Sequence, residues 1–452
     1  MLLAAALILL TLGSVLFHYL SPWYFTPIAS NWGVIDDLLG NTVFATGVAF
    51  VAVNLFMAFC VVRFRHQKGT KADYEPESKK LEGWLFVLTT AGVAALLAPG
   101  LFAWAKIVDV PKDAQVVEAV GRQWHWMFRF PGKDGKLGST DPRFVTEANP
   151  FGINPDDPDG QDDVLVVSPE LHLPVNVTRK VQLRSVDVLH DFSVPQFRVR
   201  MDLVPGLATR VWFTPNKTGT FNLNCQELCG TGHFAMLGRI VVEEQQAFDS
   251  WLATWPTFAQ SLSKPAGDAT AGAALFAVCS ACHSQNGEGN PAVHAPKLAG
   301  QSDWYLARQL KSFKGGLRGT SNGDSNGATM MPMAATLADD AAIDNVVAYI
   351  RSLPDQPAPA TLNGNFEHGK SIYNEVCGTC HGHDGKGVRA TNAPRLAGMS
   401  DWYLTTQLSN FRHGIRGRHP QDYYGQQMGS MAAMLTDDQA MTDVAAYVNS
   451  LR

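Results

Sequence analysis

The residues best suited to chemistry in this chain form a soft metal-binding set in two short stretches. The segment from Cys225 to Met236 reads C-Q-E-L-C-G-T-G-H-F-A-M, and another histidine stands upstream in D-V-L-H-D-F-S-V-P. Thiolate, imidazole and thioether ligands favour copper over oxygen-seeking cations. Structural zinc is the alternative, but zinc needs only four ligands and rarely includes methionine. Two copper ions bridged by both sulfurs suit the whole set and would leave no position for a substrate, which is typical of an electron relay. The ligand positions are His190, Cys225, Glu227 through its backbone carbonyl, Cys229, His233 and Met236.

Two further motifs have the pattern C-x-x-C-H, in which two thiols attach a haem covalently and the histidine binds its iron. A single such motif could instead be a redox dithiol or half of a zinc site. Here a shift of 98 residues superposes A-P-K-L-A-G-Q-S-D-W-Y-L on A-P-R-L-A-G-M-S-D-W-Y-L, so a duplicated haem-binding unit is the better interpretation. The motif residues are Cys279, Cys282 and His283 in the first unit, and Cys377, Cys380 and His381 in the second.

A methionine opposite the histidine would complete each iron site and raise the haem potential. The same shift aligns Met330 with Met428 and Met333 with Met431. Met331 aligns with a glycine and is not shared. The alignment alone therefore leaves two pairs of candidate ligands.

Length, charge and cysteine usage limit the class of protein. A chain of 452 residues is too long for one core and predicts about three domains. The formal net charge of −5 gives no support for nucleic-acid binding. Six of the seven cysteines belong to the copper and haem motifs, and Cys60 falls in an apolar helix, so no pair remains for a structural disulfide. Haem c is attached outside the bacterial cytoplasm, which places the soluble part in the periplasm or at the cell surface.

Three uncharged stretches near the N-terminus predict membrane helices. Residues 38–62 and 83–105 each exceed the roughly 20 apolar residues that cross a bilayer. Residues 2–17 could instead be a secretory signal, but they lack a basic start and an evident cleavage site, so we expect a retained helix. The basic loop from Arg63 to Lys80 should lie in the cytoplasm, with both flanks outside.

Short alternating runs between residues 114 and 244 predict an antiparallel β-sandwich or barrel with the copper ligands on loops at one end. The insertion 131–163 ends in D-D-P-D-G-Q-D-D. Its aspartates could bind Ca²⁺, but their spacing does not match an EF-hand, and a solvated acidic loop is favoured. The expected strands are Val116–Phe130, Val164–Ser168, Leu171–Val188, Thr209–Phe213, Thr220–Asn224 and Leu237–Glu243.

The copper motif, with V-P-G after His190 and T-G-T-F before Cys225, resembles the CuA-binding domain of cytochrome c oxidase subunit II. The two C-terminal units resemble class I cytochromes c, particularly diheme ones. The resemblance implies a cupredoxin-like fold, a dinuclear copper centre (CuA) and two covalently bound haems c. It also favours Met330 and Met428 as axial ligands, because the family ligand lies seven residues before a leucine that opens the last helix. Those leucines are Leu337 and Leu435, and the carbonyls of Pro296 and Pro394 should accept a hydrogen bond from each iron-binding histidine.

Two other roles come from the resemblance alone. Trp124, in Q-W-H-W, matches the tryptophan at which subunit II receives electrons, whereas the commoner fate of a tryptophan is burial in the core. The family usually has a bulky aromatic residue where His125 stands, so this surface should differ. Glu82 matches a glutamate near the mouth of a proton channel; the alternative is a solvated carboxylate at a helix N-terminus.

The predicted protein is multidomain. A transmembrane anchor of two or three helices (1–110) precedes a cupredoxin-like antiparallel β-barrel or sandwich (111–255) and two all-α class I cytochrome c domains (266–354 and 362–452). We expect a multi-pass protein of the bacterial inner membrane whose soluble domains lie on the periplasmic side. Its partners would be the lipid bilayer, a haem-copper catalytic subunit I, further membrane subunits and an electron donor.

The expected function is electron input to a terminal oxidase. Electrons would pass from the donor through two haems c to CuA, and on to haem in the catalytic subunit, where oxygen is reduced to water. The same role in a haem-copper nitric oxide reductase is the nearest alternative. A copper-delivery protein is a third hypothesis, disfavoured because it would need neither His233, Met236 nor haem.

Overall fold

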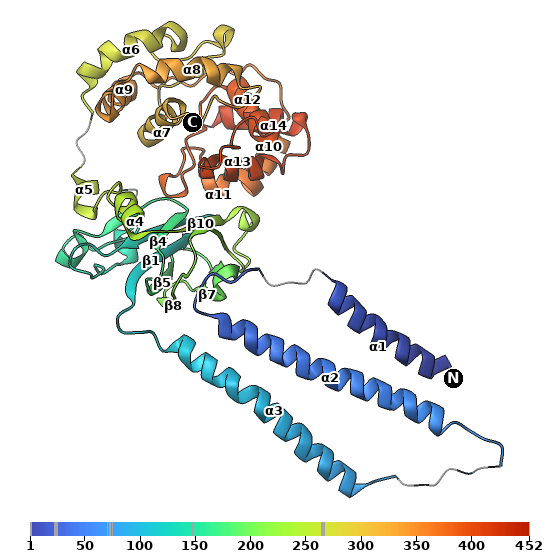
Figure 1. Ribbon diagram of the computed structural model, residues 1–452. Helices are drawn as coiled ribbons and strands as arrows, with labels where there is room; N and C mark the ends of the chain where they lie inside the picture. The colour runs from blue at the N-terminus through green and yellow to red at the C-terminus, as the bar shows by residue number, and fades with distance from the viewer. Residues whose placement is uncertain are drawn as a thin grey trace.

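The computed structural model describes residues 2–21, 26–69, 71, 74, 76–146, 148–263 and 267–451. The expected domain limits at residues 1, 266 and 452 lie outside these described residues. Along the chain, three long helices are followed by a β-domain and then by two helical units (Figure 1). This succession matches the predicted multidomain fold.

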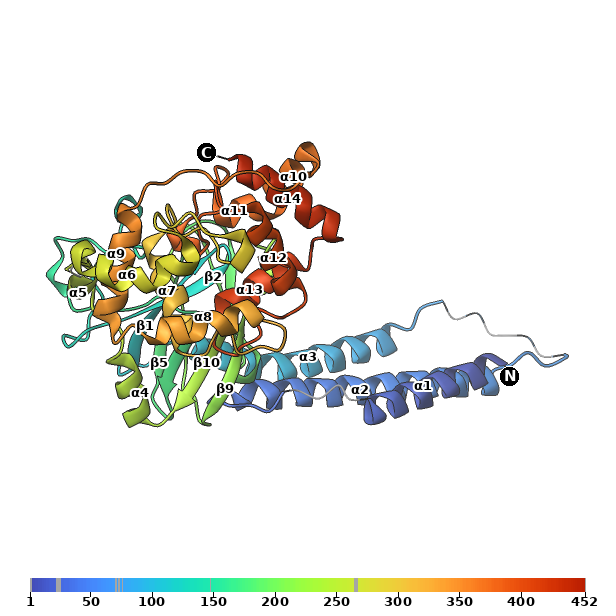
Figure 2. The same ribbon diagram turned by 90° about the horizontal axis from the view of Figure 1, so that it is seen from above.

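The three N-terminal helices are long and apolar enough to cross a membrane. They are α1 (Leu2–Leu20), α2 (Gly33–Arg63) and α3 (Lys79–Val108). α1 packs on α2, α2 packs on α3, and all three extend together to one side of the β-domain (Figure 2). Most of their large apolar side chains are exposed, which suits a lipid environment and not water.

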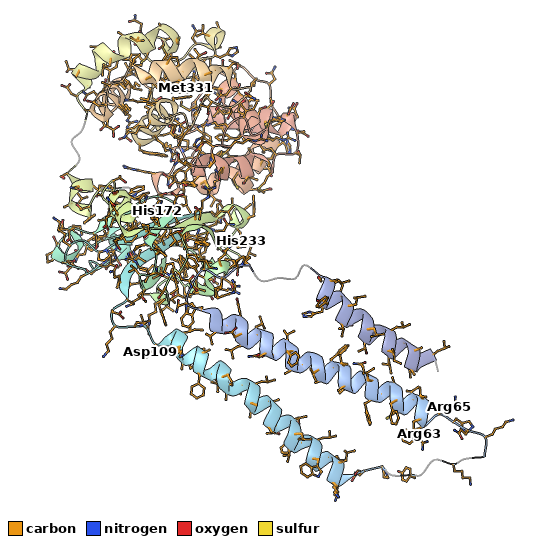
Figure 3. The ribbon with its side chains drawn as sticks, in the orientation of Figure 1. Arg63, Arg65, Asp109, His172, His233 and Met331 are labelled. Carbon is orange, nitrogen blue, oxygen red and sulfur yellow. The ribbon has the colours of Figure 1, made fainter. Side chains whose placement is uncertain are left out.

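The ends of α2 and α3 near the β-domain are attached to it. Asp36 in the first turn of α2 pairs with Arg198 at 2.6 Å. Trp32 donates from its indole nitrogen to the carbonyl of Trp212 at 3.0 Å, and Trp212 donates in turn to the carbonyl of Lys106 at 3.1 Å. Figure 3 shows Asp109 beside the β-domain and the basic residues Arg63 and Arg65 at the remote end of the helices.

The β-domain consists of two five-stranded sheets that enclose a core of aromatic and aliphatic side chains, including Trp126, Phe128 and Phe192. The sheet orders are β3-β2-β1-β5-β8 and β4-β10-β9-β6-β7. The strands of the first sheet are β1 (Gln115–Arg122), β2 (His125–Phe130), β3 (Val164–Val166), β5 (Arg179–Ser185) and β8 (Thr209–Phe213). The strands of the second are β4 (Glu170–Pro174), β6 (His190–Val194), β7 (Val199–Leu203), β9 (Gly219–Asn224) and β10 (Leu237–Glu243).

Several strands differ from the predicted runs. Val116–Phe130 is a hairpin that turns at Gln123 and Trp124, and Leu171–Val188 breaks at Asn176, whose φ of 61° lies in the left-handed region. Most strand pairs are antiparallel, but β1 with β5 and β4 with β10 are parallel. Strands β6 and β7 were not predicted, because every residue of β6 is buried and the alternating pattern that marks a half-buried strand is absent.

Two short helices, α4 (Gln245–Leu252) and α5 (Phe258–Leu262), lead from the β-domain to the helical units. Phe248 and Trp251 of α4 pack on Phe130, which attaches this connection to the core. Residues of the acidic insertion lie under α5, where the amide of Phe258 donates to the carbonyl of Asp163 at 2.8 Å.

The two C-terminal units repeat one helical plan at the predicted shift. In each, the first helix crosses the last, and Tyr349 or Tyr447 of the last helix contacts an aromatic ring of the first, Phe276 or Phe366. The second unit differs by a π-turn at Tyr373–Cys377. The first unit contains α6 (Ala269–His283), α7 (Asp303–Lys314), α8 (Ser325–Ala335) and α9 (Asp340–Ser352). The second contains α10 (Phe366–Ile372), α11 (Gly378–His381), α12 (Asp401–Arg412), α13 (Tyr423–Ala432) and α14 (Asp438–Ser450).

Candidate functional site

The candidate copper site lies at one end of the second sheet. The loop from Cys225 to Met236 joins β9 to β10, and β6 begins at His190. β9 pairs with both β10 and β6, with Ser193 opposite Asn224, so the loop and His190 meet at the same end of the sheet. His190 therefore starts a strand, and was wrongly placed on a loop by the sequence pattern.

The structure brings all six predicted ligand positions together. The two sulfur atoms of Cys225 and Cys229 are 3.8 Å apart. The Cys225 sulfur lies 4.0 Å from Nδ1 of His190 and 3.3 Å from the carbonyl oxygen of Glu227. The Cys229 sulfur lies 3.4 Å from Nδ1 of His233 and 3.9 Å from the sulfur of Met236. Each sulfur thus has its own histidine and one further donor, an arrangement that fits two soft metal ions and exceeds the needs of one zinc ion.

Neighbouring side chains orient these candidate ligands through hydrogen bonds and an ion pair. Nε2 of His190 is 2.8 Å from Asp187, so this nitrogen carries the proton and Nδ1 remains available to a metal. The same carboxylate of Asp187 accepts a hydrogen bond from the amide of Gln123 at 2.8 Å. Arg200 binds the carboxylate of Glu227, so only the backbone carbonyl of that residue faces Cys225.

The two buried thiols of Cys225 and Cys229 share a hydrogen bond, so each changes the pKa of the other. A hydrogen bond from Cys229, followed by one from His190, lowers the pKa of Cys225 to about 3. The same bond to Cys225 raises the pKa of Cys229, because its proton is shared with the neighbouring thiolate. One thiolate is therefore ready for a metal, and binding to the second sulfur must release a proton.

Trp124 packs directly on the copper loop. Its indole nitrogen donates to the carbonyl of Cys229 at 3.1 Å, and a Cβ placed on Gly232 would come within 2.4 Å of its ring. The side chain is only 3 % exposed. The neighbouring His125 is also buried and burial lowers its pKa to about 3, which keeps the ring neutral.

The histidines of the two C-x-x-C-H motifs are oriented in the same way. Nδ1 of His283 donates to the carbonyl of Pro296 at 2.8 Å, and Nδ1 of His381 donates to the carbonyl of Pro394 at 2.8 Å. The hydrogen bonds predicted from the family proline are present in both units. Each leaves Nε2 free to bind iron.

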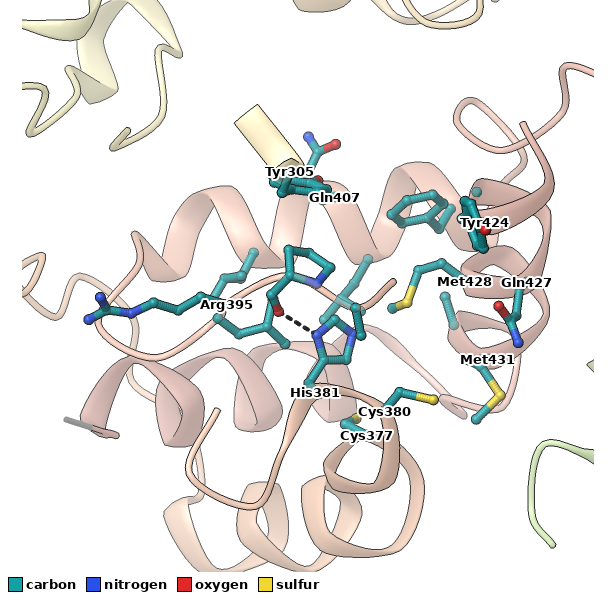
Figure 4. Close-up of a pocket in the computed structure, with 18 of the residues that line it drawn as sticks. Tyr305, Cys377, Cys380, His381, Arg395, Gln407, Tyr424, Gln427, Met428 and Met431 are labelled. Carbon is teal, nitrogen blue, oxygen red and sulfur yellow. Dashed lines mark hydrogen bonds between the residues drawn. The ribbon is translucent and has the colours of Figure 1, made fainter. Parts of the chain in front are cut away.

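The second unit contains a cavity of about 1480 Å³, its open mouth included, between His381 and helix α13. Figure 4 shows Met428 and Met431 on α13, with the sulfur of Met428 directed toward the side of the cavity where His381 lies. The lining is mostly apolar and also contains Cys377 and Cys380, a donor set that fits covalently bound haem. In the first unit Met330 is half-buried and Met333 is 40 % exposed.

Some site residues could not be found from local patterns. Tyr305 and Arg308 of the first unit line the cavity of the second, which no motif signals. Asp187 stands three residues before His190, a spacing that could have suggested its role. The solvated-loop interpretation of the insertion is wrong for Asp163, which is fully buried against Arg129 at 2.7 Å and whose pKa burial raises to about 7.

Glu82 lies in the first turn of α3, at the end remote from the β-domain. Its side chain is exposed, and its amide donates to the carbonyl of Ser78 at 2.9 Å. This position suits either of the two roles considered from the sequence.

Comparison with known proteins identifies the two halves of the chain. Residues 115–245 match the family described as cytochrome c oxidase subunit II, periplasmic domain. The chain is 55% identical over 256 residues to an alternative cytochrome c oxidase subunit 2 of Bradyrhizobium diazoefficiens, covering 57% of this chain and 92% of that protein. The chain belongs to the cytochrome c oxidase subunit 2 family.

The C-terminal part of the chain matches the cytochrome c family at residues 269–354 and 366–452. It is 32% identical over 199 residues to cytochrome c4 of Pseudomonas aeruginosa, covering 42% of this chain and 92% of that protein. Subunit 2 of Cereibacter sphaeroides is 28% identical over 218 residues, covering 45% of this chain and 69% of that protein. The chain is thus an electron-input subunit of a cytochrome c oxidase, a membrane-associated protein with a periplasmic domain, and its families imply CuA copper and haem c.

Proposed function

We propose that the cytochrome domains accept electrons from an external donor and that the copper domain delivers them to haem in a catalytic subunit that reduces oxygen to water. The observation that carries this proposal is the arrangement of two sulfurs, each with its own histidine, in the buried end of the β-domain. Such a site lacks room for a substrate, so electron transfer is the chemistry it supports best.

The geometry and the family resemblance support the following residue roles. Two copper ions would be held by Cys225, Cys229, His190, His233, Met236 and the Glu227 carbonyl. The haem irons would be held by His283 with Met330 and by His381 with Met428. When bound, these groups supply one-electron redox chemistry, and the β-scaffold limits movement of the ligands during transfer. The covalent haem attachments are Cys279 and Cys282 in the first domain, and Cys377 and Cys380 in the second.

The proposed organisation is an anchor at 1–110, a copper domain at 111–255 and cytochrome domains at 266–354 and 362–452. The basic residues at the remote end of the anchor favour a cytoplasmic position for that end, with three spans and the cofactor domains in the periplasm. Glu82 would then lie at the cytoplasmic face beside the catalytic subunit. A reporter active only outside the cytoplasm should be silent when fused near Lys71 and active near Lys112; the reverse pattern would overturn this topology.

Replacing Cys229 by Ser tests the copper assignment. The variant should lose the dinuclear centre, because no remaining ligand can replace a bridging thiolate. The haem absorbance should remain, since the cytochrome domains have separate cores. Two copper ions per chain in the purified variant would show that the ligand assignment is wrong.

Nitric oxide is the alternative final acceptor, because the difference would lie in the partner's active site. The 55% identity to an oxidase subunit favours oxygen. Polarographic measurement of oxygen and nitric oxide consumption by the purified complex decides between them.

A further inference from the structure

Helix α13 of the second cytochrome domain lies against the copper domain, above β10 (Figure 1). The hydroxyl of Tyr423 donates to the carboxylate of Glu170, and the hydroxyl of Tyr424 donates to the carbonyl of Val167 at 3.3 Å. From the copper domain, Arg239 donates to the carbonyl of Pro420 at 3.0 Å and lies over the ring of Tyr423. The two domains therefore share a polar interface of hydrogen bonds and one cation–π contact.

The side of the second domain that attaches haem also faces copper. Cys380 packs against the core cluster of the copper domain, the cluster that contains Trp124 and both copper-loop cysteines. The first cytochrome domain instead bonds to the second. Arg318 donates to Tyr403 at 2.9 Å, and Arg416 donates to Tyr305 at 3.0 Å.

A short series of bonds joins the second haem cavity to the copper loop. Gln427 lines this cavity and is covalently adjacent to Met428. Its side-chain amide donates to the backbone carbonyl of Trp124. The indole of Trp124 then donates to the carbonyl of Cys229, one of the two sulfur ligands.

The repeat shows that these contacts are specific to α13. At the shift of 98 residues, Gln427 corresponds to Thr329 on α8, whose hydroxyl bonds within its own helix. The other corresponding residues of the first domain also have shorter side chains. Tyr423, Tyr424 and Gln426 correspond to Ser325, Asn326 and Ala328.

We propose that Gln427 is a positioning residue that couples the second cytochrome domain to the copper loop through Trp124, so that electrons pass from the first domain to the second and then to copper. This inference rests on the proposed function. His381 would hold the haem that supplies one electron, and the copper loop would hold the group that accepts it, so the transfer would break no bond and require no proton. Because Trp124 is covered by α13, an external one-electron donor protein would deliver its electron to a cytochrome domain and not to the copper loop at this residue.

The test compares Gln427→Leu with Thr329→Leu in the full-length holoprotein. Leucine keeps the size of glutamine but lacks its donor, and the second variant makes the matched change in the first domain. Rapid mixing with ascorbate and a small one-electron mediator follows the haem band and the near-infrared copper band. Microwave-power saturation of the copper EPR signal, which depends on the distance to oxidised haem, reports whether the domains remain docked.

We expect Gln427→Leu to lose the fast phase of copper reduction while both haem spectra, both haem potentials and the EPR saturation stay as in the wild type. Thr329→Leu should match the wild type in every measurement. Unchanged copper reduction in Gln427→Leu, or an equal loss in Thr329→Leu, would overturn the inference. Altered EPR saturation in Gln427→Leu would overturn it too, because the residue would then hold the domains together. Absence of the copper signal from the wild-type protein would instead refute the proposed function.

Discussion

The two cytochrome domains share a haem-binding plan but have different surroundings. Both orient the iron-binding histidine through a proline carbonyl at 2.8 Å, and their last three helices begin and end at nearly equivalent positions. Yet α13 presents two tyrosines and one glutamine to the copper domain, where α8 carries shorter side chains. The two domains therefore share the motif implied to bind haem, and we infer that the outer face of α13 sets the place of the second domain in the electron path.

The contacts between the two cytochrome domains are nearly symmetric. Lys297 and Arg395, which superpose in the repeat, both bind Asp355 in the connection between the domains, at 2.7 and 2.6 Å. Arg318 and Arg416 likewise exchange equivalent bonds with the opposite domain. The asymmetry therefore arises outside this interface, at α13.

The largest effect should come from the axial methionines. Met330→Ala and Met428→Ala should each open the sixth iron position, lower the potential of that haem and remove its sulfur-to-iron absorption band. The neighbouring Met333→Ala and Met431→Ala should keep the band. Loss of the band only in the latter two variants would move both ligands three residues along.

Two of these variants, Met431→Ala and Met333→Ala, should also differ in their effect on the free energy of unfolding. Met431 is 8 % exposed, so its truncation should cost about 2–5 kcal/mol, as expected for a buried methionine. Met333 is 40 % exposed and should cost far less. Calorimetry of the holoprotein measures both, and equal losses would contradict the difference in burial.

A smaller effect is expected at the interface between the two cytochrome domains. Arg416→Ala removes donations to Tyr305 and Gln309, and Arg318→Ala removes those to Tyr403 and Gln407. Each loss should cost about 1.5–3 kcal/mol, because the donor is charged. Calorimetry should show similar decreases for both variants; a large difference would break the proposed symmetry.

The contact between Tyr423 and Glu170 should contribute about 1 kcal/mol to docking of the second domain. Tyr423→Phe should therefore lower the stability of the holoprotein slightly, whereas the matched Ser325→Ala should not. A double-mutant cycle with Glu170→Gln measures the coupling. Additive effects of the two changes would show that this bond contributes nothing to docking.

The smallest effect is a pH dependence near the same interface. Burial would lower the pKa of His172, but hydrogen bonds to Glu170 and Glu243, at 2.9 and 2.8 Å, outweigh it and raise the pKa. This contribution is fully present below the unfolded pKa of about 6.5 and is lost as pH rises through the higher folded pKa. In His172→Gln, the decrease in unfolding temperature over this pH range should be absent. Identical pH profiles for the variant and the wild type would contradict the prediction.

Local patterns predicted much of the fold. The three long apolar helices and the duplicated units follow from patterns within short windows of sequence. So do the single strands in the predicted runs at 164–168, 209–213, 220–224 and 237–243. Strand β6 escaped because uniform burial removes the alternating pattern, and the burial of Asp163 escaped because its partner Arg129 is distant in sequence. The turn at Trp124 was hidden inside one predicted β-type run, Val116–Phe130.

The sequence by itself determined the types and spacing of the candidate ligands, the two haem attachment motifs and the apolar helices, because each depends on residues close together in the chain. Only the tertiary structure decided that Asp187 orients His190, that Trp124 lies beneath α13, and that the second cytochrome domain packs on the β-domain. These features depend on contacts between residues far apart in the chain. Their geometry is set when sheets and domains pack, and no local pattern encodes it.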